Sequence, residues 1–364
     1  MKTDFILGEY LSNGAENIIK GAWKASLKNF KENIFLTKYS LSCNEAIKIR
    51  LSHEKRGEHI PSFLIGSITD SCNLHCRGCY ARENHTCGEK ASEVLLSAAD
   101  WEKIFKEAVK LGIRFFLLAG GEPLTRRDVL EVAAMYKNML FPIFTNGTML
   151  DENYFQLFDK NRNLLPVLSI EGDEGYTDER RGTGIYKKLI SVMESMKEKG
   201  IFYGTSITVT QENIYNITGD AFLSELYFKG CKVVIFVEYI PVNSTTSDLA
   251  PTNKERDYLN RILQLLRLKF EDMLFISFPG DERSSGGCLA AGRGFFHINP
   301  FGRVEPCPFS PYSDTDLRNT TILKALKSPL FQKLKDNQIL MREHNGGCVL
   351  FEQEEEVKKL SNQE

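Results

Sequence analysis

The sequence predicts an α/β protein: a partial (β/α)6 TIM-like barrel with a helical N-terminal segment and a small C-terminal domain built from a β-hairpin and helices. Between residues 62 and 240, short apolar segments alternate with longer amphipathic ones, which is typical of parallel strands joined by crossover helices. The chain has 364 residues, of which 42% are hydrophobic and 26% charged, enough for a sizeable core. Six units are fewer than a complete barrel needs, so an open doubly wound sheet also fits.

The individual elements follow from local signals. Asp100 is a candidate cap for a helix that begins at Trp101, and Gly200 follows another helical segment. The predicted strands span residues 63–69, 114–119, 141–145, 166–170, 202–209 and 233–239, and the helices between them include 101 onward, 128–138 and 186–199.

After Pro241 the alternation weakens. A helix over 254–269 and a short strand over 274–277 lead into a loop rich in Gly and charge. Pro300-Phe301-Gly302 predicts a hairpin turn, and the charged tail predicts a solvated helix. The hairpin strands are 295–299 and 303–306, the tail helix is 352–359, and the predicted domains are 1–60, 61–279 and 280–364.

The first 60 residues have a helical pattern. Trp23, Leu27, Phe30 and Ile34 recur at helical spacing, accompanied by four lysines. One interpretation is a helix packed on the main domain. The alternative is a lid or a membrane-surface helix that serves an apolar substrate, with peripheral membrane contact.

Charge and cysteine usage restrict the function classes. A formal net charge of -2 gives no global attraction to polyanions, so we expect no nucleic-acid partner. The N-terminus lacks the features of a signal peptide and no apolar run is long enough to cross a bilayer, which predicts a cytoplasmic location. Nine clustered cysteines in a reducing compartment indicate metal or cluster binding before disulfides.

Three cysteines stand close together directly after the first predicted strand. Cys72, Cys76 and Cys79 lie within eight residues, so their thiolates can converge on one soft metal centre and leave a position open. The alternative is a zinc site completed by His75, His85 or Cys87.

A glycine-rich turn ends the second predicted strand. Gly120 and Gly121 let a ligand approach the backbone closely, and Glu122 offers a carboxylate to an ammonium group. Together with the cysteine loop, this turn resembles the radical S-adenosylmethionine (SAM) superfamily over residues 62 to about 240. The resemblance implies that the three cysteines hold a [4Fe–4S] cluster whose fourth iron chelates SAM, and that Gly120, Gly121 and Glu122 contact its methionyl ammonium. It further implies reductive cleavage to a 5′-deoxyadenosyl radical, with an external flavodoxin- or ferredoxin-like electron donor.

Other cofactor contacts follow from the same resemblance. Many members carry an aromatic residue near the adenine, immediately before the third cysteine. This chain has Gly78 there, with Tyr80 just beyond, and the end of the sixth strand, 237–239, is expected to approach the adenine through its backbone. The remaining residues expected to bind SAM are Asn146, Ser169, Glu171 and Arg181.

The C-terminal cysteines form a second group. Cys288, Cys307 and Cys348 flank and follow the predicted hairpin, and this region resembles the twitch form of the SPASM extension, which implies an auxiliary Fe–S cluster. The fourth iron is either open or completed by His344, Glu352 or Cys231, and metal-free cysteines or a zinc site are the alternatives. Cys87 is a candidate hydrogen donor or catalytic thiol, or else a loop residue.

These observations favour a radical SAM enzyme that abstracts hydrogen from a small-molecule or lipid substrate in an oxidation or a coupling. The alternative within enzymes is a maturase that modifies a ribosomally made peptide. A zinc-binding adaptor or nucleic-acid module is the contrasting class, and it leaves the glycine-rich turn without a role.

Overall fold

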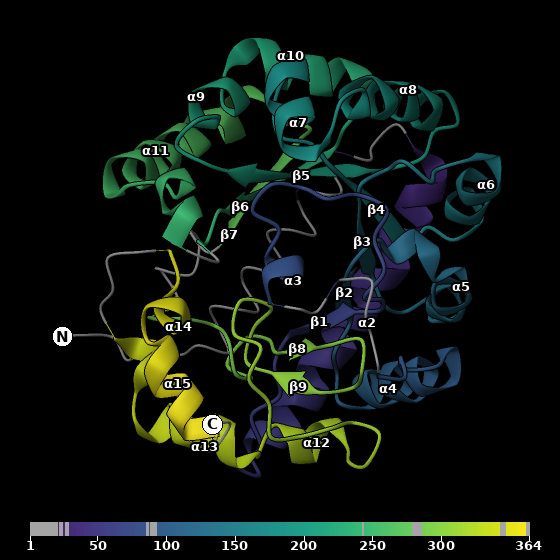
Figure 1. Ribbon diagram of the computed structural model, residues 1–364. Coiled ribbons are helices and arrows are strands. Elements are labelled where there is room, and N and C mark those ends of the chain that lie inside the picture. Colours follow the sequence, from purple (N-terminus) through teal and green to yellow (C-terminus); the bar gives the residue numbers. More distant parts are fainter. Residues whose placement is uncertain are drawn as a thin grey trace.

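The computed structural model describes residues 21, 25, 29–84, 87, 93–241, 244–278, 286–342 and 347–361. Its centre is a curved sheet in which β1 to β7 are consecutive, parallel neighbours (Figure 1). The predicted barrel-like α/β class is confirmed. The strands are β1 (Phe63–Ser67), β2 (Phe115–Ala119), β3 (Phe141–Thr145), β4 (Leu164–Ser169), β5 (Gly204–Val209), β6 (Val233–Glu238) and β7 (Leu274–Phe278).

All six predicted barrel strands are present with small shifts at their ends. The short strand expected after the barrel, β7, pairs in parallel with β6 and is therefore the seventh strand of the same sheet. β-branched and aromatic side chains suit this sheet because both of its faces are covered or enclosed.

Helices surround the sheet. Trp101 and Phe105 of α4 pack edge-on against Phe116 of β2, and Phe105 also contacts Phe141 of β3. The α4 helix begins after Ser97, whose side chain caps it while Asp100 completes a capping box, so the predicted cap at Asp100 was wrong by one turn. The barrel helices are α3 (Tyr80–Glu83), α4 (Ala98–Lys110), η1 (Pro123–Thr125), α5 (Arg127–Met135), α6 (Glu152–Lys160), α7 (Glu174–Arg181), α8 (Ile185–Glu198), α9 (Ile214–Ile217), α10 (Asp220–Lys229), η2 (Ser244–Leu249) and α11 (Asn253–Lys269).

The C-terminal region continues the barrel sheet. Strand β8 (His297–Ile298) pairs in parallel with β1, and β9 (Val304–Glu305) pairs antiparallel with β8, which confirms the predicted hairpin. The predicted tail helix is two helices, and they lie beside the hairpin in Figure 1. The C-terminal helices are α12 (Ile322–Ala325), α13 (Pro329–Asp336), η4 (Ile339–Met341), α14 (Val349–Glu352) and α15 (Glu354–Ser361).

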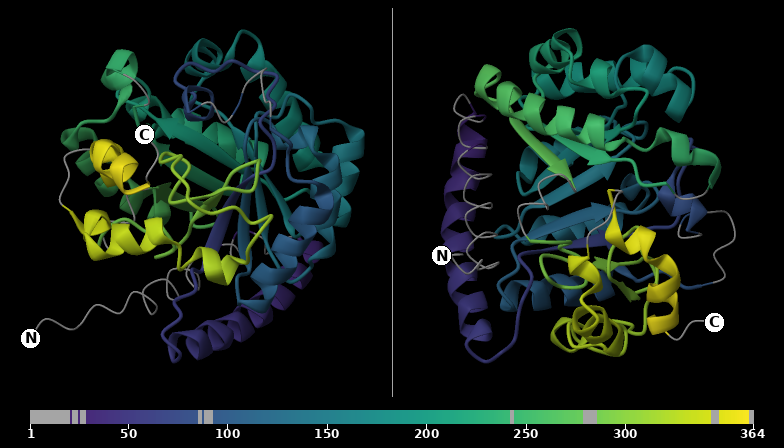
Figure 2. Two further views of the ribbon diagram at one scale, coloured as in Figure 1. Left: turned by 60° about the horizontal axis from the view of Figure 1, so that its bottom comes forward. Right: turned by 90° about the vertical axis from the view of Figure 1, so that its left-hand side faces the viewer.

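A long helix, α2 (Phe30–Glu54), crosses the amino-terminal ends of the strands (Figure 2). It is held there by polar contacts: Arg162 forms an ion pair with Glu32 at 2.7 Å, and Arg114 donates to Ser42 Oγ at 2.7 Å. The predicted apolar face was wrong, because Phe30 and Ile34 are exposed. Trp23, Leu27 and three of the four accompanying lysines lie outside the described residues.

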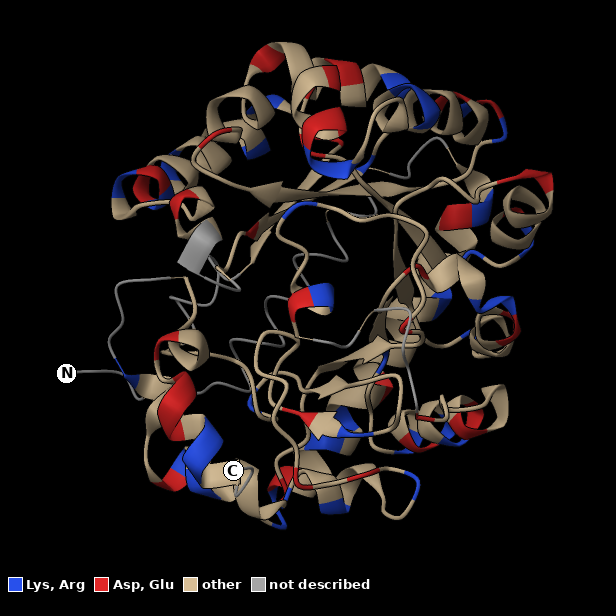
Figure 3. Ribbon diagram, viewed as in Figure 1, with Lys and Arg blue, Asp and Glu red and all other residues tan. Residues whose placement is uncertain are grey.

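The two faces of the strands differ in burial. Along β2, β6 and β7, residues that face the helices are buried and those that alternate with them are only partly buried. Because Phe116 faces α4, its neighbours Phe115 and Leu117 face the lumen of the barrel. Charged residues gather on the helices and loops, and Glu238 is the only one on β1 to β7 (Figure 3). The lumen-facing side chains of β1 to β7 are therefore uncharged, whereas His297 of β8 and Glu305 of β9 share the lumen face of Ile65, with Nδ1 and Oε2 2.7 Å apart.

Among the described helices, none is long and apolar enough to span a membrane.

Candidate functional site

The cysteine loop lies over the carboxyl ends of the strands, where barrel enzymes carry their reactive groups. Its first part is tied to the loop after β3, since Asn73 Nδ2 donates to Thr148 Oγ1 at 2.8 Å. Its middle is tied to the end of α7, because Arg77 N donates to Arg180 O at 2.9 Å. The loop thus crosses the mouth of the lumen, and α3, which follows it, lies inside the ring of helices in Figure 1.

The Gly-Gly-Glu turn is packed directly against the cysteine loop. Gly121 N donates to Thr69 O at 2.9 Å, and Glu122 N donates to Ser71 O at 2.7 Å. A Cβ on Gly120 would stand 2.4 Å from Thr69 O, and one on Gly121 would stand 2.1 Å from Ser71 O. Only glycine permits this approach, so the turn fixes the position of the loop that carries Cys72.

Glu122 lies beneath the turn. Its Oε1 accepts from Leu124 N at 3.1 Å and Thr145 Oγ1 at 2.6 Å, and its Oε2 accepts from Asn146 N at 2.7 Å. Burial raises the pKa of this carboxyl to about 7, against the lowering effect of these hydrogen bonds. In this arrangement the side chain joins β2 to β3, and its contact with a methionyl ammonium stays a prediction.

Polar donors surround the thiols of the loop. Leu74 N lies 3.5 Å and Asn146 Nδ2 lies 3.9 Å from Cys72 Sγ, and Arg181 Nη1 lies 3.9 Å from Cys76 Sγ. A hydrogen bond with Cys87 lowers the pKa of the Cys72 thiol, whereas burial raises that of Cys76. Cys87 is thus brought to the cysteine loop, as its predicted role requires.

Two arginines share one buried carboxylate behind the loop. Glu171, at the end of β4, is 1% exposed and accepts from Arg180 Nη1 at 2.6 Å and Arg181 Nε at 2.8 Å, while Thr208 N donates to its other oxygen at 3.0 Å. Two guanidinium groups against one carboxylate leave a net positive charge beside Cys76. The resemblance offers Arg180 and Arg181 as alternatives for a cofactor-binding arginine and favours Arg181, and in the structure both pair with Glu171.

Other predicted cofactor residues lie at the same end of the barrel. Ser169 Oγ is 3.2 Å from Ser206 Oγ at the ends of β4 and β5. The Tyr80 ring, in contrast, packs edge-on against Phe309, with ring centroids 5.0 Å apart, so it faces the C-terminal hairpin. The aromatic ring next to Gly78 belongs to Tyr239, which follows β6.

The second cysteine group lies in and around the hairpin. Ala291 N donates to Pro306 O at 3.0 Å, which joins the segment after Cys288 to the strand that leads into Cys307. Cys348 begins α14, and its neighbour Gly347 packs so closely on Glu238 of β6 that a Cβ there would stand 2.2 Å from Glu238 Oε1.

The structure places the candidate fourth ligands of the second group in different parts of the molecule. Cys231 lies at the opposite end of the barrel, at the start of β6, bonded to Val233 O and near Thr205, so its predicted role as a fourth ligand was wrong. Glu352 is exposed at the end of α14, and His344 is outside the described residues.

No three His, Cys, Asp or Glu side chains of the described part of the chain converge closely enough to hold a single metal ion. The positive charge beside Cys76 suits an anionic Fe–S cluster.

Residues 67–214 match the radical SAM superfamily. An AdoMet-dependent heme synthase from Methanosarcina barkeri is 24% identical over 80% of this chain and 88% of its own length. A PqqA peptide cyclase from Granulibacter bethesdensis is 23% identical over 68% of this chain and 67% of its own length. Streptococcus suis SuiB, solved with its precursor peptide SuiA, has a TM-score of 0.65 and 17% identity over 84% of this chain and 75% of SuiB.

The superfamily match covers the cysteine loop, the Gly-Gly-Glu turn and the ends of β3 and β4, which the structure brings together at the mouth of the lumen. The match implies a [4Fe–4S] cluster and SAM as cofactors. Residues 67–214 form a radical SAM superfamily domain, and the similarities indicate an enzyme of that class.

Proposed function

We propose that this enzyme binds its [4Fe–4S] cluster through Cys72, Cys76 and Cys79 and abstracts hydrogen from an uncharged part of a peptide. We infer the substrate class from the side chains that line the lumen beneath the cysteine loop. Leu117, Ile235 and Ile276 face it and are partly exposed, whereas their outward-facing neighbours are buried. A substrate group that reaches into the barrel meets an apolar surface.

A lumen with few charged groups disfavours substrates with several ionised groups. Burying a carboxylate without a charged partner costs several kcal/mol, β1 to β7 offer no cationic side chain, and His297 of β8 is already bonded to Glu305. A haem-type macrocycle carries carboxylates around its rim, so it fits poorly despite the similarity to a heme synthase. The hydroxyls of Ser169 and Ser206 at the ends of β4 and β5 are polar groups that suit a backbone amide.

The comparisons support a peptide over the small molecule or lipid that the sequence favoured. SuiB was solved with a precursor peptide, and PqqA peptide cyclase is named for one. A peptide presents apolar side chains on an uncharged backbone, which is the chemistry that the lumen accepts.

The residues around the cysteine loop have distinct roles in this proposal. When bound, the cluster and SAM supply a 5′-deoxyadenosyl radical that removes a hydrogen atom from the substrate. Gly120 and Gly121 present their backbone to the methionyl end of SAM, and Asn146 orients Cys72. Arg181, fixed by Glu171, provides positive charge beside Cys76. The apolar lumen excludes water from the reactive centre.

We assign the auxiliary role to the second cysteine group. Cys288, Cys307 and Cys348 would hold a second Fe–S cluster beside the barrel. That cluster would accept the electron that remains when a substrate radical loses a proton and becomes an oxidised product.

Iron content and nucleoside formation test the proposed cluster. The protein is purified and reconstituted without oxygen, and iron per chain is counted before and after Cys72, Cys76 and Cys79 are replaced by Ala. We expect about eight irons to fall to about four, and 5′-deoxyadenosine to form only in the parent after dithionite and SAM are added. Stoichiometric zinc with no nucleoside would overturn the assignment.

Deuterium transfer tests the substrate class. Parent enzyme is offered fully deuterated peptides, deuterated lipid vesicles or an iron–coproporphyrin, and deuterium in 5′-deoxyadenosine is measured by mass spectrometry. We expect transfer from the peptides only, and transfer from lipid or macrocycle alone would contradict the peptide assignment. Ile235→Glu, which places charge in the lumen, should abolish transfer but keep SAM cleavage. Leu268→Glu, on the exposed face of α11, is the matched control.

A further inference from the structure

A serine, a histidine and a glutamate form a hydrogen-bonded line across three strands. His297 of β8 has its Nδ1 2.7 Å from Oε2 of Glu305 on β9, and its Nε2 lies 2.8 Å from Oγ of Ser67 on β1. Asn299 Nδ2 donates to the other oxygen of Glu305 at 2.7 Å, which fixes the carboxylate. These four residues are only 1–4% exposed, so solvent does not compete for their hydrogen bonds.

The line runs toward the reactive end of the barrel. Ile65 of β1 is the register partner of His297, and His297 is the register partner of Glu305, so all three lie on the lumen face. Ser67 is two residues beyond Ile65 on the same face of β1 and is therefore closer to the cysteine loop. Its register partner on β2 is Ala119, the smallest of the side chains that β2 directs into the lumen. A substrate group in the lumen can therefore reach the Ser67 hydroxyl beside this small side chain.

Stability alone does not explain this network. A buried ionisable pair adds little to folding compared with apolar residues of similar size, because both groups lose their hydration. The order of the groups has a chemical use instead. In a neutral imidazole, a carboxylate at Nδ1 keeps the proton on that nitrogen, so His297 Nε2 accepts from the Ser67 hydroxyl. This ring can take up a second proton through Ser67.

We infer that Ser67 and His297 accept the proton that the substrate radical loses when it is oxidised, with Glu305 as the positioning residue. This inference rests on the proposed function, which assigns the abstraction of hydrogen and the acceptor of the electron but no acceptor of the proton. The line of hydrogen bonds supplies that acceptor at the edge of the lumen.

The oxidation step balances as follows in this relay. An X–H bond beside the radical carbon breaks, where X is the neighbouring atom that carries a hydrogen. Two of the three electrons involved form the second bond of a C=X group, and the third passes to the Fe–S cluster proposed at the second cysteine group. The proton moves to Ser67 Oγ while the hydroxyl proton of Ser67 moves to His297 Nε2.

The ratio of oxidised peptide to 5′-deoxyadenosine tests the relay. The probe is a deuterated peptide that transfers deuterium to the nucleoside with the parent enzyme, and both products are counted by mass spectrometry. His297→Gln keeps a hydrogen-bonding group near Ser67 but cannot take up a proton, so it should form as much nucleoside as the parent and lower the ratio about 100-fold. The matched control is His53→Gln, which should keep the ratio. His53 Nδ1 also pairs with a glutamate, Glu58, at 2.9 Å, but on α2 at the amino-terminal ends of the strands.

Substitutions of Ser67 distinguish a relay from a structural contact. Ser67→Ala removes the hydroxyl that meets the substrate and should lower the ratio about tenfold or more. Ser67→Thr keeps a hydroxyl and should keep the ratio. A network that only held the hairpin in place would lower stability to denaturant and leave the ratio unchanged in each variant, which would overturn the inference. Glu305 is not substituted because it is two residues from Cys307, a proposed cluster ligand.

The tautomer of His297 gives a readout that needs neither cluster nor substrate. In cluster-free protein with ¹⁵N-labelled histidine, the chemical shifts of the ring nitrogens show which of them carries a proton, and His297→Gln identifies the signal. We expect a proton on Nδ1 and none on Nε2. A proton on Nε2 at neutral pH, with or without one on Nδ1, would overturn the inference because this nitrogen could not accept another.

The outcomes separate this inference from the proposed function. If no peptide transfers deuterium with the parent, both fail together. If a peptide does and His297→Gln keeps the parent ratio, only the relay is overturned. Equal losses of nucleoside and oxidised peptide in both His297→Gln and Ser67→Ala would also overturn it, because the two residues would then act before hydrogen abstraction.

Discussion

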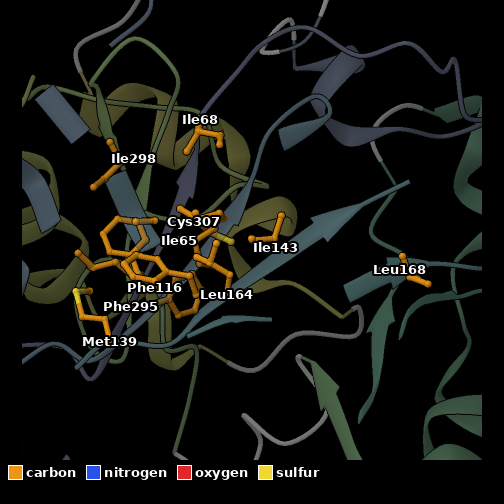
Figure 4. Packing of buried hydrophobic residues seen from close by; sticks show 14 of the residues in the cluster. Ile65, Ile68, Phe116, Met139, Ile143, Leu164, Leu168, Phe295, Ile298 and Cys307 are labelled. Carbon is orange, nitrogen blue, oxygen red and sulfur yellow. The ribbon is translucent and has the colours of Figure 1, made fainter. Parts of the chain in front are cut away.

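The two cysteine groups of this protein occupy contrasting surroundings. The first cysteine group, Cys72, Cys76 and Cys79, lies on a loop over the barrel mouth among arginines, amides and backbone N–H groups. The second cysteine group, Cys288, Cys307 and Cys348, lies in or against the hydrophobic core, where Cys307 is 4% exposed and belongs to the same buried cluster as Ile65 and Phe295 (Figure 4). One residue type is thus placed in two different electrostatic settings.

This difference indicates different tasks. Positive charge and an open edge suit a cluster that binds a polar cofactor, because the site can accept both the ligand and an added electron. The second group packs against apolar residues, with Arg293 donating to Cys288 O, and this more apolar setting suits a cluster that only stores or passes electrons. The comparison predicts that disturbing the first group stops SAM cleavage, whereas disturbing the second uncouples cleavage from product formation.

Single cysteine replacements give the largest expected contrast. Cys76→Ala should remove about four irons and abolish 5′-deoxyadenosine formation. Cys348→Ala should remove a similar amount of iron, keep nucleoside formation and lose product. Iron analysis and chromatography of the nucleoside check both variants. Loss of nucleoside in both would mean that the two groups do not have separate tasks.

The charge network behind the first group gives the next largest effect. Glu171→Gln removes the carboxylate that pairs with two arginines and leaves their charge buried, which should lower the free energy of unfolding by about 3–5 kcal/mol. Denaturant unfolding of cluster-free protein measures it. Glu179→Gln is the matched control on α7, the helix that carries both arginines, where the exposed ion pair with Arg77 should contribute less than about 1 kcal/mol. Equal losses of stability in the two variants would show that burial does not determine how much the Glu171 network contributes.

Glu122, in the same region, should make the stability of the protein depend on pH. Burial raises its pKa from 4.5 to about 7, so the folded state holds a proton that the unfolded state has released. Its contribution to stability is full below pH 4.5 and is lost as pH rises towards 7, a change of about 3 kcal/mol. In cluster-free protein, Glu122→Gln should flatten this fall in stability between pH 4.5 and 7. An unchanged slope would contradict the raised pKa.

The sequence predicted this end of the barrel well because its signals are local. The six strands follow from short apolar segments, and the cysteine loop and the Gly-Gly-Glu turn follow directly after two of them. What could not be predicted depends on pairing between distant segments. Arg180 shares Glu171 only because α7 folds back over β4, and Tyr239 meets Gly78 only because β6 ends beside the loop.

For the N-terminal helix α2, the sequence analysis predicted the wrong buried face. Apolar residues at helical spacing predicted its buried face, but Phe30 and Ile34 are exposed. Its buried face is formed by Leu36, Tyr39 and Ala46 together with Glu32 and Ser42, which contact arginines near the starts of β4 and β2. The polar residues on this face interrupt the hydrophobic periodicity, and the pattern that starts at Trp23 therefore indicated a different face.

The smallest expected effect lies in the C-terminal region. Arg342 forms a two-point ion pair with Glu356 of α15, but both side chains are more than a third exposed. Because solvent and salt screen such a pair, Arg342→Ala should leave the denaturant midpoint unchanged within error and should keep the full iron content. A clear loss of iron would mean that surface charge positions Cys348, and that the second cysteine group depends on electrostatics as the first does. An unchanged protein would agree with a second group held by apolar packing.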